Sequence, residues 1–140
     1  MKKLVKDADI VIENYRTGVM ERLGLGYEDL KAINPGIIYC SVSGFGRTGP
    51  YAKRGGYDLI AQGMSGIMSF TGVPGTPPVK AGVPIADMNA GMFSVYGILT
   101  AYINKLKTGN GQYLEISLLE AALAYTVWES AGYFATGEVA

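Results

Sequence analysis

One acidic residue, Asp87, stands alone in a long uncharged part of the sequence. The stretch V-P-I-A-D-M-N-A-G-M-F-S-V-Y-G-I-L, from Val83 to Leu99, contains no other charge. In one interpretation Asp87 is a helix N-cap, whose carboxylate accepts hydrogen bonds from backbone N–H groups of the first turn. In the other, a carboxylate exposed at the end of a loop rich in glycine and proline attacks an electrophile, as Asp and Glu do in covalent catalysis. These residues alone leave both interpretations open.

The composition excludes several other kinds of catalytic site. The chain has no histidine, so it lacks the usual base at neutral pH, a Ser-His-Asp triad and any His-containing metal site. Cys40, the single cysteine, cannot form an internal disulfide, and its place in an apolar run predicts a small buried side chain. The stretch S-G-F-G-R-T-G-P matches neither the phosphate-binding loop nor the dinucleotide fingerprint. A carboxylate nucleophile, which needs no general base, is compatible with this composition.

Basic side chains in loops or at helix starts could hold the phosphates of an anionic ligand, although each one taken singly is more often a solvated surface charge. These residues are Arg16, Arg22, Arg47, Lys53 and Arg54. Two aromatic residues, Tyr15 and Phe45, could stack on a flat ring or cover the edge of a sheet. Basic and acidic residues number 12 each, so no net charge draws the chain to nucleic acid or to an anionic membrane. Any anionic ligand must be held by local groups.

Two predicted strands bring these loops together. Ile10–Ile12 and Gly36–Ser43 are apolar runs typical of buried strands, and the helical pattern between them stops at Asn34-Pro35. A strand, helix, strand unit of this kind is parallel with a right-handed crossover, so the loops after Asn14 and Ser43 meet at one carboxyl edge. Open α/β sheets bind ligands at that edge, and these loops suit a flat, anionic molecule.

The alternation of helix and strand continues to the end of the chain. We expect a helix over Tyr57–Met68, then a loop rich in proline and glycine. One apolar stripe predicts a helix that begins near Asp87; the stripe consists of Met92, Val95, Tyr96, Leu99, Tyr102, Ile103 and Leu106. A third strand is expected over Gln112–Ile116. Ser117 and Glu120 then form a capping box that opens a helix reaching Trp128.

Length and composition predict about one globular domain. The chain has 140 residues, of which 49% are hydrophobic and 17% charged, a composition that excludes intrinsic disorder. Its start lacks the apolar region of a signal peptide, and its longest uncharged run, 88–104, is too short and polar for a membrane span. These features predict a soluble, cytoplasmic protein. Neither end carries a polar tail or capping element, so we expect a piece of a larger protein.

Five strings along the chain resemble the class III coenzyme A (CoA) transferase family, whose fold α-methylacyl-CoA racemases share. They are N-Y-R-T-G-V-M-E-R-L-G-L-G-Y-E-D-L, N-P-G-I-I-Y-C-S-V-S-G-F-G-R-T-G-P-Y, G-Y-D-L-I-A-Q-G-M-S-G, V-P-I-A-D-M-N-A-G and T-G-N-G-Q-Y-L-E-I-S-L-L-E. The resemblance implies an α/β fold with part of a Rossmann-like parallel sheet and flanking helices. It places residues 1–140 in the middle of the large domain of an interlocked homodimer, with N-terminal strands and a C-terminal small domain outside the segment.

The resemblance also assigns roles to residues. It implies that Asp87 is the catalytic aspartate, which attacks an acyl-CoA thioester and passes CoA to a small carboxylic acid through covalent aspartyl intermediates. Tyr57 and Asp58 match positions beside that aspartate. CoA-binding positions are matched by Asn14, Tyr15, Arg16 and Arg22. A lysine that contacts CoA in some members falls near Gly55, where Arg54 or Lys53 could replace it. CoA is a substrate in this family, so no tightly bound cofactor and no metal are expected.

Two alternatives remain beside CoA transfer. The racemases resemble this chain but carry histidine in place of Tyr57, and a tyrosine with a pKa of about 10 is a poor acid/base at neutral pH. We therefore expect transfer rather than racemisation. In the second alternative, the segment is a non-catalytic binding or assembly domain in which Asp87 only caps a helix. For each enzymatic interpretation, the segment alone is expected to be inactive, because family members are interlocked dimers.

Overall fold

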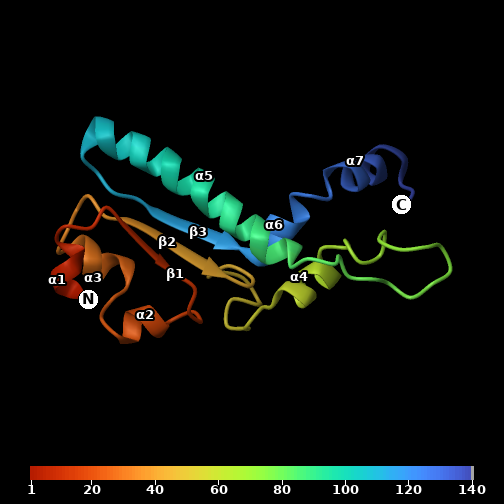
Figure 1. Ribbon diagram of the computed structural model, residues 1–140, viewed down its shortest axis with the longest axis horizontal. Helices are drawn as coiled ribbons and strands as arrows, with labels where there is room; N and C mark the ends of the chain where they lie inside the picture. Colours follow the sequence, from red (N-terminus) through yellow and green to blue (C-terminus); the bar gives the residue numbers. More distant parts are fainter. Residues whose placement is uncertain (140) are drawn as a thin grey trace.

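A parallel sheet forms the centre of the structure, a computed structural model that describes residues 1–139 (Figure 1). Within this range its strands are β1 (Ile10–Glu13), β2 (Ile38–Ser43) and β3 (Tyr113–Ser117), in the order β1-β2-β3. Ile12 pairs with Cys40, and Cys40 pairs with Leu114. The strands predicted from the apolar runs, and their parallel direction, are confirmed.

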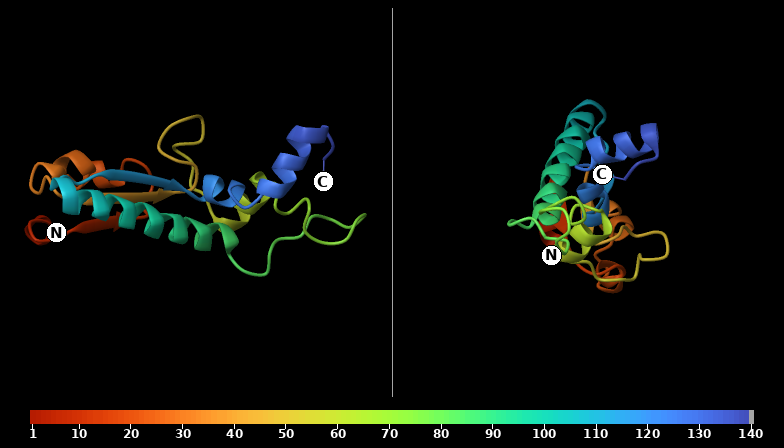
Figure 2. Two further views of the ribbon diagram at one scale, coloured as in Figure 1. Left: turned by 90° about the horizontal axis from the view of Figure 1, so that it is seen from above. Right: turned by 90° about the vertical axis from the view of Figure 1, so that its right-hand side faces the viewer.

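Alternate side chains of β2 enter two different cores. Tyr39 packs with Val5, Met20 and Leu30 beneath the N-terminal helices, whose bounds are α1 (Lys2–Val5), α2 (Val19–Arg22) and α3 (Tyr27–Lys31). Cys40 is fully buried on the other face, against α5 (Ile85–Thr108). In the end-on view at the right of Figure 2, α5 lies on one side of the sheet, and α2 and α3 lie on the other side. The fold is therefore α/β, with helices on both faces of the sheet.

The long helix α5 is present as predicted, but the apolar stripe is not its buried face. The buried residues of α5 are mostly small, and Ile98 and Ala101 among them pack against β2: Ala86, Asn89, Ala90, Ser94, Ile98 and Ala101. Large apolar side chains form the outer face of α5, defined here as Met92, Val95, Tyr96, Leu99, Ile103 and Leu106, each between 47% and 71% exposed. Tyr102 packs partly against the sheet. Small residues let α5 lie close to β2 and β3, which a pattern of large apolar residues cannot indicate.

Two predicted helices are shorter than expected. α4 (Asp58–Met64) ends near Gly66, whose φ of +87° belongs to the left-handed region and stops the helix. The helix after β3 breaks into α6 (Leu118–Leu123) and α7 (Val127–Thr136), so the expectation of one helix reaching Trp128 is wrong. Thr126 at the break donates a side-chain hydrogen bond to the carbonyl of Leu123. The predicted cap is confirmed, because Ser117 Oγ accepts from the N–H of Glu120.

Helix α5 begins at the carboxyl ends of the strands, beside α4 and α6 (Figure 1). Alanines fill the junction of these three helices and let them approach closely: Ala61, Ala86, Ala90, Ala121 and Ala122. The loop between α4 and α5 extends away from the sheet at the same end, as does α7. No helix among the described residues is both long and apolar enough to cross a membrane. The junction of α4, α5 and α6 therefore fixes the position of Asp87 relative to the sheet edge.

Candidate active site

Asp87 lies in the first turn of α5 but is not its N-cap. The N-cap position is Pro84, and no side chain of the helix itself caps the turn. Asp58 at the start of α4 does so instead: its Oδ1 accepts from the N–H of Ala86 at 2.8 Å and of Asp87 at 3.4 Å. The interpretation of Asp87 as a cap is therefore wrong. Its exposed carboxylate has no hydrogen-bond partner within residues 1–139 and is free to contact a ligand.

The surroundings of Asp87 change its acidity. Partial burial, and then the nearby negative charge of Asp58, raise the pKa of Asp87 above its ordinary value. A more basic carboxylate is a stronger nucleophile once it is ionised. Asp58 therefore has two effects: its hydrogen bonds hold the first turn of α5, and its charge makes the side chain of Asp87 less acidic.

A cavity of about 540 Å³ opens beside this carboxylate, and we call it the Asp87 cavity. On α5, the small residues Ala90, Gly91 and Ser94 line the cavity beside Asp87, together with the larger Val95 and Ile98. Its opposite wall comes from the end of the sheet and from Tyr57, which is 75% exposed. The cavity therefore offers space for an acyl group against a free carboxylate.

A smaller hollow of about 180 Å³ adjoins the Asp87 cavity, and we call it the arginine cleft. Arg16, Arg54 and Tyr15 line this cleft, and three residues line both hollows: Asn14, Gly56 and Tyr57. The Arg54 guanidinium lies over the Tyr51 ring, 4.4 Å from its centroid, which orients this charge. One end of a bound molecule can therefore meet two arginines while its other end reaches Asp87.

Two glycines make this arrangement possible. The backbones of Gly44, after β2, and Gly56, before α4, touch so closely that a Cβ on either would lie 2.5 Å from the Cα of the other. A real Cβ cannot occupy that position without movement of the backbone. Glycine at both positions therefore brings Tyr57 against the carboxyl edge of the sheet.

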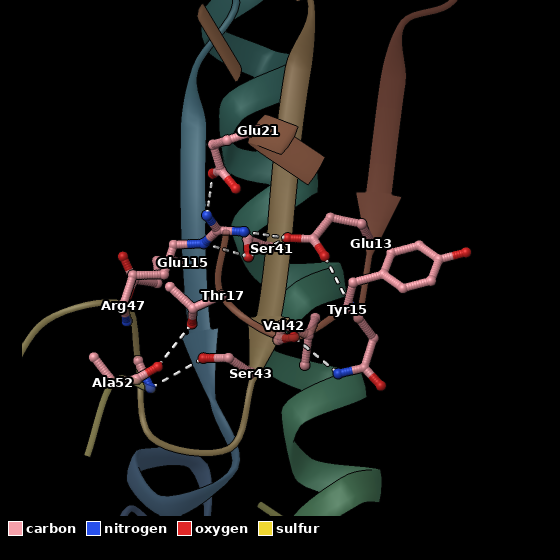
Figure 3. A network of polar contacts seen from close by, with 12 residues as sticks. Glu13, Tyr15, Thr17, Glu21, Ser41, Val42, Ser43, Arg47, Ala52 and Glu115 are labelled. Atoms are coloured by element: carbon pink, nitrogen blue, oxygen red, sulfur yellow. Dashed lines mark hydrogen bonds and ion pairs between the residues drawn. The ribbon is translucent and has the colours of Figure 1, made fainter. Parts of the chain in front are cut away.

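A buried ion pair holds the loop that carries Asn14, Tyr15 and Arg16. Figure 3 shows Glu13 at the end of β1, joined to the guanidinium of Arg47. Glu13 is 4% exposed, and Arg47 Nη2 lies 2.6 Å from its Oε1. The other oxygen, Oε2, accepts from the N–H of Tyr15 at 2.7 Å. Arg47 also donates to Ser41 Oγ at 2.9 Å and pairs with Glu21. The guanidinium of Arg47 is therefore occupied by Glu13, Glu21 and Ser41, and the expectation that it could hold a ligand phosphate is wrong.

Two further hydrogen bonds join the loop after β1 to β2 and to the loop that follows β2. Asn14 Nδ2 donates to the carbonyl of Val42 at 2.8 Å, and Thr17 Oγ1 donates to that of Ala52 at 2.8 Å. Glu13 and Ser41 were not recognised in the sequence as site residues. The charged Glu13 that ends the apolar run I-V-I was the available signal, because a carboxylate in a buried strand requires a partner.

The structure brings most of the predicted site residues together, with clear exceptions. Arg22 is exposed on α2, and neither Arg22 nor Lys53 lines either hollow. Asp58 lies behind the start of α5, so it contacts Asp87 through the backbone rather than from the cavity. Phe45 packs on Tyr51, with ring centroids 5.5 Å apart. Within residues 1–139, no group of three or more His, Cys, Asp or Glu side chains could hold a metal ion.

A third hollow of about 470 Å³ lies between α5, β3 and α6, and Asp87 does not line it. Its lining includes Phe93, Tyr96 and Leu114, and the charged residues in that lining are Glu115 and Glu120. Two carboxylates and no basic residue make it unsuitable for a phosphate-bearing ligand. The Asp87 cavity with the arginine cleft is therefore the better candidate site.

The chain matches the family model described as CoA-transferase family III over residues 1–140. It is 45% identical over 137 residues to a succinate–glutarate CoA-transferase of Agrobacterium fabrum, covering 98% of this chain and 34% of the relative. An acetyl-CoA:oxalate CoA-transferase of Acetobacter aceti is 43% identical over 137 residues, covering 97% of this chain and 35% of the relative.

Solved structures give the same result. A CAIB/BAIF family protein from Brucella suis superposes with a TM-score of 0.97 at 46% identity, covering 99% of this chain and 37% of that one. The chain spans about a third of the length of the curated relatives it matches. The family model matches over residues 1–140, the two relatives are similar to this chain in sequence, and the solved structure has the same fold. The chain belongs to CoA-transferase family III.

Proposed function

We propose that the protein containing this chain transfers CoA from an acyl-CoA thioester to a small carboxylic acid, with Asp87 as the nucleophile. The observation that carries this proposal is a free carboxylate in a cavity that adjoins a cleft with two arginines. The relatives named as succinate–glutarate and acetyl-CoA:oxalate CoA-transferases support small carboxylic acids as the substrate class.

The proposed reaction has four steps. An Asp87 oxygen attacks the thioester carbon, the C–S bond breaks, and CoA leaves as a thiolate, giving a mixed anhydride. The thiolate attacks the aspartyl carbonyl and releases the donor carboxylate, leaving an aspartyl-CoA thioester. The acceptor carboxylate then attacks that carbonyl and expels the thiolate. Finally, the thiolate attacks the acceptor's acyl carbon, which forms the new acyl-CoA and frees Asp87.

The other site residues bind and orient. Arg16 and Arg54 hold phosphates of CoA at the arginine cleft, where charge-assisted hydrogen bonds favour an anion. Asn14 and Tyr15 line the path of the ligand, and Tyr57 contacts it where the two hollows meet. Asp58 keeps the start of α5 in place. Arg22 contributes at most a distant positive charge, since it lines neither hollow.

The proposed function includes assembly into a homodimer. The outer face of α5 leaves large apolar side chains exposed, and a surface of this kind marks a contact with other protein. Further parts of a large domain, or a second copy of the chain, can cover this face. The mass of the full-length protein in solution tests the dimer.

Trapping the covalent intermediate tests the function. Full-length protein incubated with acyl-CoA should form an adduct, sensitive to hydroxylamine, on the peptide that contains Asp87. Asp87→Asn should abolish both the adduct and transfer, whereas the control Asp7→Asn, at an exposed position in the turn after α1, should change neither. Normal transfer by Asp87→Asn would overturn the proposal. Deuterium uptake at the α-carbon in heavy water without an acceptor acid would instead indicate racemisation.

A further inference from the structure

One buried amide connects α4 to the segment 81–83, which leads into α5. Gln62 in α4 is 0% exposed. Its Nε2 donates to Asp58 Oδ2 at 2.6 Å and to the carbonyl of Val83 at 3.3 Å, and its Oε1 accepts from the N–H of Ala81 at 2.8 Å. Both ends of the amide are used, as a buried polar side chain requires.

These contacts leave the Asp58 carboxylate with one orientation. Gln62 holds its Oδ2, while its Oδ1 faces the first turn of α5 and accepts from Ala86 and Asp87. The contacts to Ala81 and Val83 hold the chain that leads into that turn. A single side chain therefore fixes both the cap of the helix and the segment that enters it.

We propose that Gln62 is a positioning residue for Asp87: through Asp58 and the 81–83 segment it holds the carboxylate that reacts. This inference rests on the proposed function, because it assumes that Asp87 is the nucleophile. Gln62 lines neither the Asp87 cavity nor the arginine cleft, so it acts without touching the substrate. The effect of its loss should fall on the rate of the covalent step rather than on CoA binding.

A purely structural role predicts a different result. If Gln62 only stabilises the junction of α4 and α5, its substitution reduces the folded fraction, but each folded molecule reacts at the normal rate. Normalising the rate of adduct formation to the amount of Asp87 that finally reacts removes the effect of unfolded protein. The normalised rate constant therefore separates the two roles.

The test uses Gln62→Met in the full-length protein, which removes the hydrogen bonds and keeps a similar volume. We expect the normalised rate constant for the Asp87 adduct at saturating acyl-CoA to fall about 10- to 100-fold, as for a reacting group misplaced by a fraction of an ångström. The acyl-CoA concentration for half-saturation should change less than about twofold. Gln112→Met is the matched control, since Gln112 is exposed and its side chain contacts Asn104; its rate should be unchanged.

Gln62→Glu decides the question if the methionine variant fails to fold. At low pH the protonated glutamic acid can donate to Asp58 as the amide does, but at higher pH two carboxylates face each other and Asp58 is displaced. The charged groups beside Gln62 and its partners are Asp58, Asp87 and Lys80, whose Nζ donates to the carbonyl of Ala81 at 3.0 Å, and Tyr57 lines the cavity with Asp87. The normalised rate of Gln62→Glu relative to the unsubstituted protein should therefore fall as pH rises from about 5 to 8.

The outcomes distinguish the inference from the function on which it rests. The role of Gln62 would be overturned if Gln62→Met had the same normalised rate constant as the unsubstituted protein. It would also be overturned if the rate of Gln62→Glu, relative to the unsubstituted protein, did not vary with pH. Either result would leave Asp87 as the nucleophile. Absence of any adduct on Asp87 in the unsubstituted protein would overturn the proposed function itself.

Discussion

At the scale of single residues, the site depends on the different roles of Asp58 and Asp87. The carboxylate of Asp58 accepts hydrogen bonds from the backbone of α5, whereas the carboxylate of Asp87 accepts none from residues 1–139. An aspartate near the start of a helix would ordinarily be drawn into capping. Because another element supplies the cap, Asp87 remains available for a ligand.

Removal of the Asp58 charge should make Asp87 more acidic. The negative charge of Asp58 raises the pKa of Asp87, so Asp58→Asn should lower it, and the acid side of the pH profile for adduct formation should move to lower pH. The rate at high pH should fall several-fold, since a less basic carboxylate is a weaker nucleophile. Asp29→Asn is the matched control, because Asp29 accepts from the N–H of Gly26 at the start of α3. An unmoved profile would contradict the electrostatic effect of Asp58.

Arg16 and Arg22, both predicted to bind phosphates of CoA, should differ in how much they contribute to CoA binding. Arg16 lines the arginine cleft and Arg22 does not. Loss of a charge-assisted hydrogen bond costs about 1.5 to 3 kcal/mol, so Arg16→Gln should weaken CoA binding about tenfold or more. Arg22→Gln should change it less than about twofold at physiological salt, as for a screened surface charge. Titration of full-length protein with CoA by calorimetry measures both, and equal losses would show that the cleft extends to α2.

At the scale of elements, the contact between Gly44 and Gly56 sets the distance between the sheet edge and α4. Gly56→Ala would place a Cβ 2.5 Å from the Gly44 Cα, so the two backbones must separate. We expect transfer activity to fall more than about tenfold, because Tyr57 and the loop carrying Arg54 would move away from Asn14. Gly132→Ala in α7 is the control: it meets no atom within 4 Å and should keep full activity. An active Gly56→Ala protein would show that this contact is not needed.

The sequence predicted elements better than it predicted contacts between them. β1 and β2 were recognisable because their apolar runs are short and bounded, and the parallel rule then brought Asn14 and Gly44 to one edge. The buried face of α5 was not recognisable, since periodicity reports where large apolar residues lie and not which side meets the sheet. The Asp58 cap and the Glu13–Arg47 pair join residues 28 or more positions apart, which a local pattern cannot reveal.

At the scale of the whole molecule, the surface carries more large apolar side chains than a self-sufficient unit would expose. The outer face of α5 is one such region, and α7 adds Trp128 and Phe134, each 84% exposed. Leu99→Lys with Ile103→Lys should therefore make residues 1–140 associate less when expressed alone, but should destabilise the full-length protein by several kcal/mol if the face is covered there. Light scattering and urea unfolding measure the two effects. Unchanged stability of the full-length protein would show that this face remains in water.

Because Cys40 is fully buried, chemical labelling of its thiol can report when the sheet opens. β1 and β3 flank its strand, and α5 covers its side chain. Burial raises the pKa of the thiol, so a thiol-modifying reagent cannot reach the sulfur and the reactive thiolate form is disfavoured. Modification must wait until the strands separate. The rate at which Cys40 is labelled therefore measures how often the centre of this domain unfolds, and a ligand that stabilises the native state should slow that labelling in proportion.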